Sequence, residues 1–354
     1  FMENASAPAT PGMSATPAAP ATPTVPTTMT AWTQTRYGDP SVLERREVPV
    51  PSVGADEVLI RVAATSINAA DRYIADPALL MRPMVGRLRG PKVPIGGLDV
   101  AGTIVAIGDA VDGFAIGDEV FGDLGGGFGP YVAGSTDLVA RAPAAMSLVE
   151  AAGVPVAGLT ALQGLRDHGR LRAGERVLVN GASGGVGTFA VQVAAALGAE
   201  VTAVCSTKNV DTARGLGAAD VVDYTTTDVV AHLVESGRTF DIVFDVAGVF
   251  STKQLARLLS PEGRCVFVGA PSGGRILGPI RSLIPSMIAG RLRRTEFVTF
   301  VAKSNGDDMA TLAAMIDAGQ VRTVVDEVLP IAELPAAFTR FRQGHLAGKV
   351  VVAH

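Results

Sequence analysis

A glycine-rich turn, NGASGGVGTFA at residues 180–190, is the stretch whose residue types and spacing most directly indicate chemistry. It follows the apolar run ERVLV and precedes a helical pattern, in which apolar residues recur at i, i+3, i+4 and i+7 from Val186 to Leu197. The N–H groups at the start of such a helix attract an anion, and glycines let a pyrophosphate approach the backbone. Because the turn does not match G-x-G-x-x-G literally, a tight turn that only packs helix on sheet is the alternative.

The residues after the next apolar run, EVTAVC, indicate which dinucleotide this turn would hold. An acid there would accept a hydrogen bond from a free ribose 2′-hydroxyl. The sequence has hydroxyls and a cation instead, which suit a 2′-phosphate. NADP(H) is therefore predicted over NAD(H), and the alternative is a solvated helix N-cap with an incidental lysine. The predicted phosphate ligands are Ser183, Gly184, Gly185, Val186, Gly187, Ser206, Thr207, Lys208 and Asn209.

Two kinds of secondary structure must position these residues, so we expect an α/β protein. Residues 57–120 contain short β-branched runs between Gly, Asp and Pro turns, which predicts an antiparallel, barrel-like region. After Ala151, apolar runs alternate with helical segments, which is typical of a parallel doubly wound sheet. Beyond about residue 300 the pattern is helix, strand, helix and strand, and periodicity does not decide which sheet these strands join. The runs of the second region are RVLVN, EVTAVC, DVVDY, DIVFDV and RCVFVG.

Composition sets the class of protein. A chain of 354 residues with 48% hydrophobic residues is long enough for about two folded domains. The net charge of −4 gives no general attraction to nucleic acid. Two cysteines, Cys205 and Cys265, cannot form a disulfide framework, which favours the cytoplasm. No apolar run approaches the roughly 18 residues of a membrane span, so no transmembrane segment is predicted.

The first 28 residues form a Pro/Ala/Thr-rich tail with a single charge, Glu3. Such a segment cannot bury enough apolar surface to order itself, so disorder is predicted. Phe1 ahead of Met2 is interpreted as a cloning remnant.

Five motifs, spread over nearly the whole chain after Met29, carry a resemblance to a known family. They are SINAADRY (66–73), PIGGLDVAGTIVAIGDAVDGFAIGDEVFG (94–122), AGVPVAGLTALQGL (152–165), GERVLVNGASGGVG (174–187) and GKVVV (348–352). In these motifs the chain resembles the zinc-independent quinone oxidoreductase branch, which is zeta-crystallin-like, of the medium-chain dehydrogenase/reductase superfamily. The resemblance implies a GroES-like β-barrel substrate domain (29–150 and 302–354) and an inserted Rossmann domain (151–301). It also implies a homodimer formed through the edge of the Rossmann sheet.

The zinc ligands of the family's metal-dependent members are missing. Leu98 and Asp99 stand where those relatives carry a His-Glu pair, and both cysteines fall in the Rossmann region. The four histidines have no neighbouring Cys or His at ligand spacing. No metal site is therefore predicted.

Hydride transfer to a conjugated carbonyl leaves negative charge on oxygen, so the reaction needs a hydrogen-bond donor and a proton source. The resemblance places Asn68 and Asp71 near the nicotinamide and makes the phenol of Tyr73 the donor. The alternative for Tyr73 is an amphipathic residue at the domain seam, with its hydroxyl satisfied by backbone.

Further cofactor contacts follow only from the resemblance. Thr160 would lie beside the nicotinamide, and Tyr224 would lie on the adenine side or else be a core aromatic. The expected contacts to the nicotinamide ribose and carboxamide are Asp245, Ala247, Val268 and Gly269.

The predicted function is a metal-free, NADPH-dependent oxidoreductase that reduces a quinone or another small hydrophobic conjugated carbonyl. An enoyl-thioester or natural-product ene reductase is one alternative, and a non-catalytic nucleotide-binding or membrane-peripheral protein is another. The membrane alternative rests on two basic segments, 81–92 and 275–294, in which arginines interleave with apolar residues. Lid loops with a solvated charge run are the favoured interpretation of these segments, so only weak contact with a membrane surface is considered.

Overall fold

The computed structural model describes residues 24–79, 82–87, 89–268, 295–344 and 346–354. The predicted cofactor contact of Gly269 and the predicted basic segment 275–294 lie outside these ranges. The predicted disordered tail (1–28), basic segment 81–92 and Rossmann domain (151–301) lie partly outside them. The predicted tail, residues 1–28, extends one residue into the first strand. Thr27 accepts a hydrogen bond from the N–H of Val50, and Thr28 already begins a strand.

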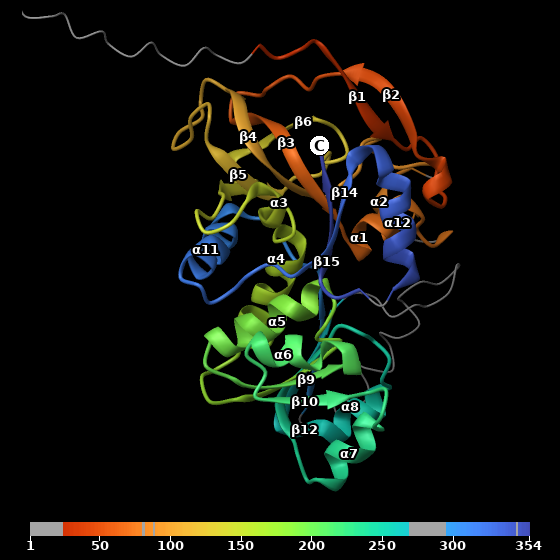
Figure 1. The fold of residues 1–354 in the computed structure, drawn as a ribbon, viewed down its shortest axis with the longest axis vertical. Coiled ribbons are helices and arrows are strands. Elements are labelled where there is room, and N and C mark those ends of the chain that lie inside the picture. Colours follow the sequence, from red (N-terminus) through yellow and green to blue (C-terminus); the bar gives the residue numbers. More distant parts are fainter. Residues whose placement is uncertain (1–23, 80–81, 88, 269–294, 345) are drawn as a thin grey trace, which may run out of the picture.

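The first unit is built on a seven-stranded sheet, counted over the described residues, with the order β14-β15-β3-β4-β5-β7 and β6 paired to β3 (Figure 1). Its pairs are antiparallel except β14 with β15, which confirms the antiparallel region predicted from the β-branched runs. The strands are β3 (Glu57–Ile67), β4 (Asp99–Ile107), β5 (Glu119–Asp123), β6 (Tyr131–Ser135), β7 (Val139–Arg141), β14 (Val325–Pro330) and β15 (Lys349–Ala353). Because β15 pairs with β3, the C-terminal strands join this first sheet.

A hairpin and short helices surround this sheet. The hairpin strands are β1 (Thr28–Thr33) and β2 (Glu44–Pro49). The helical elements are η1 (Pro40–Val42), α1 (Ala69–Ala75), α2 (Arg82–Val85), η3 (Thr136–Leu138), α3 (Leu148–Ala151), α11 (Gly306–Asp317), η6 (Ile331–Glu333) and α12 (Leu334–Gln343). The indole of Trp32 ties the hairpin to η6, since its Nε1 donates to the carbonyl of Ile331 at 2.6 Å.

The second unit is a parallel sheet of six described strands in the order β10-β9-β8-β11-β12-β13, the doubly wound order in which the first and fourth strands are neighbours. Its strands are β8 (Arg176–Asn180), β9 (Glu200–Cys205), β10 (Asp220–Asp223), β11 (Phe240–Asp245), β12 (Leu259–Val268) and β13 (Glu296–Phe300). Its helical elements are α4 (Pro155–Gln163), η4 (Gly164–His168), α5 (Gly185–Ala196), η5 (Thr207–Asn209), α6 (Val210–Gly215), α7 (Val229–Glu235) and α8 (Thr252–Leu258). Central strands such as β8 are buried along nearly their whole length, which explains their unbroken apolar runs. No described helix is long and apolar enough to cross a membrane.

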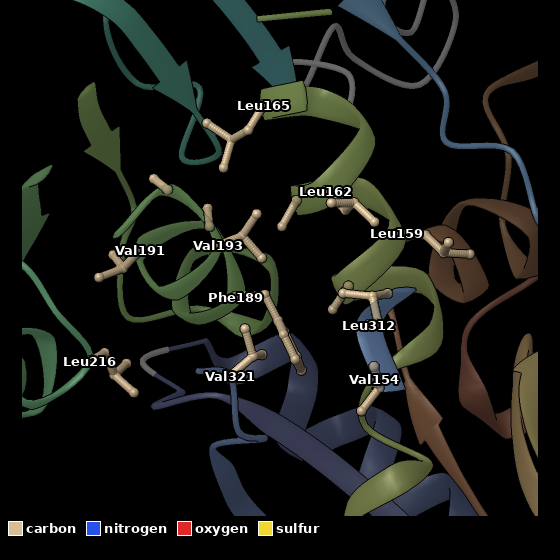
Figure 2. Packing of buried hydrophobic residues seen from close by; sticks show 14 of the residues in the cluster. Val154, Leu159, Leu162, Leu165, Phe189, Val191, Val193, Leu216, Leu312 and Val321 are labelled. Atoms are coloured by element: carbon tan, nitrogen blue, oxygen red, sulfur yellow. The ribbon is translucent and has the colours of Figure 1, made fainter. Parts of the chain in front are cut away.

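One apolar core joins the two units across α4. Figure 2 shows Leu159 and Leu162 of α4 beside Phe189 and Val193 of α5, with Leu312 of α11 next to them. The same cluster continues into the first sheet through small buried residues such as Ala101. The two units are therefore packed against each other along α4.

Candidate functional site

The carboxyl ends of the parallel strands form one row, which brings together residues far apart in the sequence. In the sheet register Asn180 pairs with Asp245 on one side and Val204 on the other, and Asp245 also pairs with Phe267. The turn after β8, the residues after β9 and the ends of β11 and β12 therefore lie along the same edge. Ligands of doubly wound sheets bind at this edge, next to the neighbouring first and fourth strands.

The glycines of the turn at 181–187 serve different purposes. A β-carbon at Gly187 would lie 2.1 Å from the carbonyl oxygen of Gly181, so this glycine allows the close turn into α5. A β-carbon at Gly185 would lie 2.8 Å from Cδ of Lys349. At Gly184, the N-cap of α5, it would meet only the Gly181 oxygen, at 3.7 Å. Gly184 thus leaves a cradle of bare backbone at a helix N-terminus, and this cradle fits a phosphate of a dinucleotide.

An acid that the sequence argument missed lies beside the residues after β9. Asp223 ends β10 and pairs with Cys205 across the sheet. Its carboxylate accepts hydrogen bonds from the hydroxyls of Thr207, at 2.5 Å, and Thr225, at 2.6 Å. These bonds hold the pKa of Asp223 below its usual value, so it is charged at neutral pH. The predicted 2′-phosphate site therefore contains a carboxylate in addition to Lys208.

The other residues of this group take different positions. Ser206 and the buried Asn209 bond to each other through their side chains at 3.3 Å, which shapes the start of η5. Tyr224 is 52% exposed, so the alternative in which it is a core aromatic is wrong. Val186 is partly buried in the first turn of α5, and the backbone oxygen of Ser183 accepts a hydrogen bond from Gly348.

Asp245 is buried at the end of β11 and points into the protein. Its Oδ1 accepts from Asn180 Nδ2 at 2.7 Å and from the N–H of Gly248 at 3.0 Å, so the side chain fastens two neighbouring strand ends together. Burial raises the pKa of this carboxyl. Burial, with the nearby Asp245, also raises the pKa of the Cys265 thiol well above its usual value. This cysteine is therefore a protonated core residue at neutral pH.

The remaining predicted contacts lie on both sides of the turn. Ala247 is exposed and lies against Gly181, and Val268 is partly exposed at the end of β12. Thr160 lies on α4, where its hydroxyl donates to the carbonyl of Val156 at 2.6 Å.

A buried polar cluster lies where β3 ends and β4 and β15 begin, and Asp99 is its centre. Asp99 Oδ2 accepts from Ser66, from Asn68 Nδ2 at 2.8 Å and from Lys349 Nζ at 3.2 Å. Its Oδ1 accepts from the N–H of Val156, in the first turn of α4, at 2.8 Å. Asp99 and Lys349 are both almost completely buried. Removal of either partner of such an ion pair costs about 3–5 kcal/mol.

Asn68 and Asp71 hold the start of α1, the helix that carries Tyr73. Asn68 is the N-cap residue, and its side-chain oxygen accepts from the ammonium of Lys349. Asp71 accepts from the N–H of Asn68 at 2.9 Å and from that of Leu98 at 3.1 Å, so each of its oxygens already bonds to a backbone group. Burial, followed by repulsion from Asp99, raises the pKa of Asp71 to about 7. Tyr73 is 44% exposed near the end of α1.

Sequence reasoning did not assign roles to Asp99 and Lys349, although both stand in the quoted motifs. Asp99 was noted only as the replacement of a zinc ligand, and Lys349 only as part of GKVVV. Their pairing joins residues 250 positions apart, so no local spacing predicts it. The available signal was a lysine at the start of an otherwise apolar strand, where its charge requires a partner.

Known proteins place this arrangement in a family. Residues 54–144 match the alcohol dehydrogenase GroES-like domain, and residues 216–352 match the zinc-binding dehydrogenase domain. The chloroplastic quinone oxidoreductase QR1 of Triphysaria versicolor is 32% identical over 324 residues, which cover 89% of this chain and 95% of that protein. The chain belongs to the quinone oxidoreductase branch of the medium-chain dehydrogenase/reductase superfamily.

Two further matches of this quinone oxidoreductase-like protein bear on its chemistry. The trans-enoyl reductase pgmF of Aspergillus terreus is 36% identical over 322 residues, covering 85% of this chain and 87% of that protein. The structure of the quinone oxidoreductase from Coxiella burnetii aligns with a TM-score of 0.79 and 25% identity, covering 92% of this chain and 99% of that chain. The predicted fold, a GroES-like domain with a Rossmann-type sheet, is thereby confirmed. The protein is an oxidoreductase with a nicotinamide cofactor.

One domain match carries zinc binding in its description. Nowhere in the described residues do three or more His, Cys, Asp or Glu side chains gather in a way that could hold a metal ion. Beside Asp99 the cation is the ammonium of Lys349.

Proposed function

We propose that this oxidoreductase reduces a quinone or another small conjugated carbonyl with hydride from NADPH, without a metal ion. When bound, the nicotinamide supplies the hydride. The chain binds the dinucleotide along the strand-end row, orients the acceptor over it, and donates a hydrogen bond to the oxygen on which charge develops.

The observation that carries this proposal is the contact between the glycine turn and the start of β15, whose first residue, Lys349, reaches α1. The N–H of Gly348 donates to the carbonyl of Ser183 at 2.9 Å. From there Lys349 reaches Asn68, the residue at which α1 begins. The cradle at Gly184 and the helix of Tyr73 are thus parts of one site built from both units, as hydride transfer between a cofactor and a separately held acceptor requires.

Within this site Tyr73 is the hydrogen-bond donor. Its phenol can donate a hydrogen bond to a developing enolate or quinol oxygen. Asn68 and Asp71 act on α1, because the bonds described above already engage their polar atoms. Their part in the reaction is to fix the position of α1 and, with it, the orientation of the Tyr73 side chain.

Selection of NADPH is assigned to Ser206 and Lys208. A hydroxyl and a cation stabilise a 2′-phosphate, whereas Asp223 opposes it. The carboxylate of Asp223 bonds to Thr207 and Thr225, which spreads its charge over neutral donors. We propose that the attraction of Lys208 and Ser206 for the 2′-phosphate exceeds its repulsion by Asp223.

The test is a screen of NADPH oxidation with quinones, enones, enals and acyl thioesters, run in parallel with NADH. The expected result is turnover with quinones or enones at a higher kcat/KM than with thioesters. Turnover with none of these acceptors, by protein that binds NADPH, would refute the proposal. Dialysis against a chelator should leave kcat unchanged, and loss of turnover that added Zn²⁺ restores would refute the metal-free mechanism.

The second candidate is reduction of an enoyl thioester or a related natural-product alkene. The similarity to the trans-enoyl reductase pgmF favours it, since that relative is 36% identical. Preference for an acyl thioester in the same screen would decide for this candidate.

A homodimer is proposed through β13. This strand is the last of the parallel sheet, and among the described strands it pairs only with β12. Because none of the described strands pairs with its other edge, we propose that a second copy pairs there. Light scattering that gives the mass of a monomer at micromolar concentration would refute the dimer.

The cytoplasm remains the proposed compartment. The Triphysaria relative is named as chloroplastic, so fractionation of the native cells is the deciding measurement.

A further inference from the structure

Lys349 is fastened to the glycine turn at its backbone and along its stem. Gly348, just before it, donates its N–H to Ser183 and forms an isolated parallel bridge with Gly184. The stem then passes Gly185, where a β-carbon would lie 2.8 Å from Cδ of the lysine. The absence of a side chain at Gly185 therefore makes room for Lys349.

The backbone of Lys349 is also held from the other side. Its N–H donates to the carbonyl of Val324 at 2.8 Å. Gly348 has a φ of +104°, and a β-carbon there would lie 2.1 Å from the same carbonyl oxygen. Because the chain is clamped between Val324 and Ser183, the start of the lysine stem has a fixed position.

At its other end Lys349 determines the orientation of Asn68. The ammonium donates to Asn68 Oδ1, and Asn68 Nδ2 donates to Asp99 at 2.8 Å. With the oxygen facing a cation and the nitrogen facing a carboxylate, only one orientation of the amide satisfies both partners. Asn68 begins α1, so this lock fixes the helix of Tyr73.

We propose that Lys349 is a positioning residue for hydride transfer, which fixes α1 relative to the glycine turn by spanning the two. This inference rests on the proposed function, because that function assigns the cofactor to the glycine turn and the acceptor to α1. Lys349 touches neither reactant in this account. It acts because a displacement of about 1 Å between cofactor and acceptor can lower the rate by about 10²-fold.

A purely structural ion pair would make a different prediction. Asp99 already accepts from Ser66, Asn68 and the N–H of Val156, so it does not depend on Lys349 for hydrogen bonds. If the pair serves only stability, a neutral replacement of both partners restores the folded state and the rate together. If Lys349 positions α1, the neutral pair restores the folded state alone.

The experiment compares wild type with Lys349→Met, the double variant Asp99→Asn/Lys349→Met, and the exposed control Lys253→Met on α8. Thermal unfolding, the Kd for NADPH and kcat with the best acceptor are measured. The double variant is expected to unfold near the wild-type temperature and bind NADPH within about threefold, while kcat falls at least about tenfold. The control should match wild type in all three. Wild-type kcat in the double variant would overturn the proposal.

Hydrogen exchange of α1 gives a second readout that needs no acceptor. In wild type, NADPH should slow exchange in both the turn and residues 69–75, whereas in the double variant protection should stay in the turn. Equal protection of residues 69–75 in both proteins would overturn the role of Lys349. Absence of NADPH binding to wild type would instead refute the proposed function.

If the double variant does not fold, the variant Gly185→Ala tests the role of Lys349 instead. The added methyl displaces the lysine stem and leaves both charges in place, so kcat should fall at least about tenfold. Wild-type kcat in this folded variant would overturn the proposal.

Discussion

The stem of Lys349 occupies the space that a side chain at Gly185 would need, since Cδ of the lysine lies 2.8 Å from the position of a β-carbon there. The neighbouring Gly184 has open space instead, with the nearest atom 3.7 Å from its β-carbon position. Glycine is therefore present at these two adjacent positions for different structural reasons. Gly185 leaves room for a residue of the same chain, whereas Gly184 borders open space, which we propose a phosphate of the cofactor occupies.

Gly184→Ala and Gly185→Ala should consequently affect different quantities. The first should weaken NADPH binding, and the second should lower kcat. Ala fits the backbone of residue 184, where φ is −79°, so this variant should fold normally and bind NADPH at least roughly tenfold more weakly. Gly185→Ala should mainly lower kcat, through Lys349. Fluorescence titration of NADPH and steady-state rates measure the two effects. Normal NADPH affinity in Gly184→Ala would mean that the phosphate does not approach the turn at this residue.

The preference for NADPH over NADH should depend on two opposite charges near the end of β9, Lys208 and Asp223. Lys208→Ala should weaken NADPH binding at least roughly tenfold and change NADH binding by less than roughly twofold, because only NADPH carries the 2′-phosphate. Asp223→Asn removes the opposing carboxylate, so it should strengthen NADPH binding. The Kd values of both dinucleotides, measured by calorimetry, check this. Equal affinities of wild type for NADPH and NADH would remove the role given to Ser206 and Lys208.

Loss of the phenol of Tyr73 should slow the reaction without weakening cofactor binding. Tyr73→Phe keeps the ring and removes the proposed donor, so kcat should fall by roughly 10²-fold while the Kd for NADPH stays the same. Tyr131→Phe, at the start of β6 in the first sheet, is the matched control and should keep the wild-type kcat. If Tyr73→Phe turns over at the wild-type rate, another group supplies the hydrogen bond and the proton.

Stability should fall as pH rises toward neutrality because of Asp71. Its pKa is about 7 in the folded protein and near 3.8 when unfolded, so between these values the folded state holds a proton that the unfolded state has lost. The free energy of unfolding therefore decreases from about pH 4 to pH 7 through this group. In Asp71→Asn this decrease should be smaller, as measured by urea unfolding across that range. Asp123→Asn is the comparison: the pKa of Asp123 is raised to about 6 by burial, so its contribution should end about one unit lower. An identical pH dependence in Asp71→Asn and wild type would show that folding does not raise the pKa of Asp71.

Local patterns in the sequence determined the secondary structure and the cofactor half of the site. Alternating and continuous apolar runs predicted the antiparallel and the parallel sheet, because side-chain burial on one or both faces of a strand follows directly from its sequence. The turn from Gly181 to Gly187 was recognisable for the same reason, since strand, turn and helix are contiguous. Assignment of Tyr73 and Thr160 came from the family resemblance, because a single tyrosine or threonine has no local signature.

Only the tertiary structure decided which distant charges meet. The sheet register brings Asp223 beside Thr207 and so puts an acid where the sequence after β9 had none. Pairing of β15 with β3 brings Lys349 to Asn68 and Asp99 and lays its stem across Gly185. Such contacts depend on strand order and chain return over hundreds of residues, which periodicity does not encode. The sequence predicted the turn at which a dinucleotide is proposed to bind, and the fold decided how that turn is connected to the start of α1.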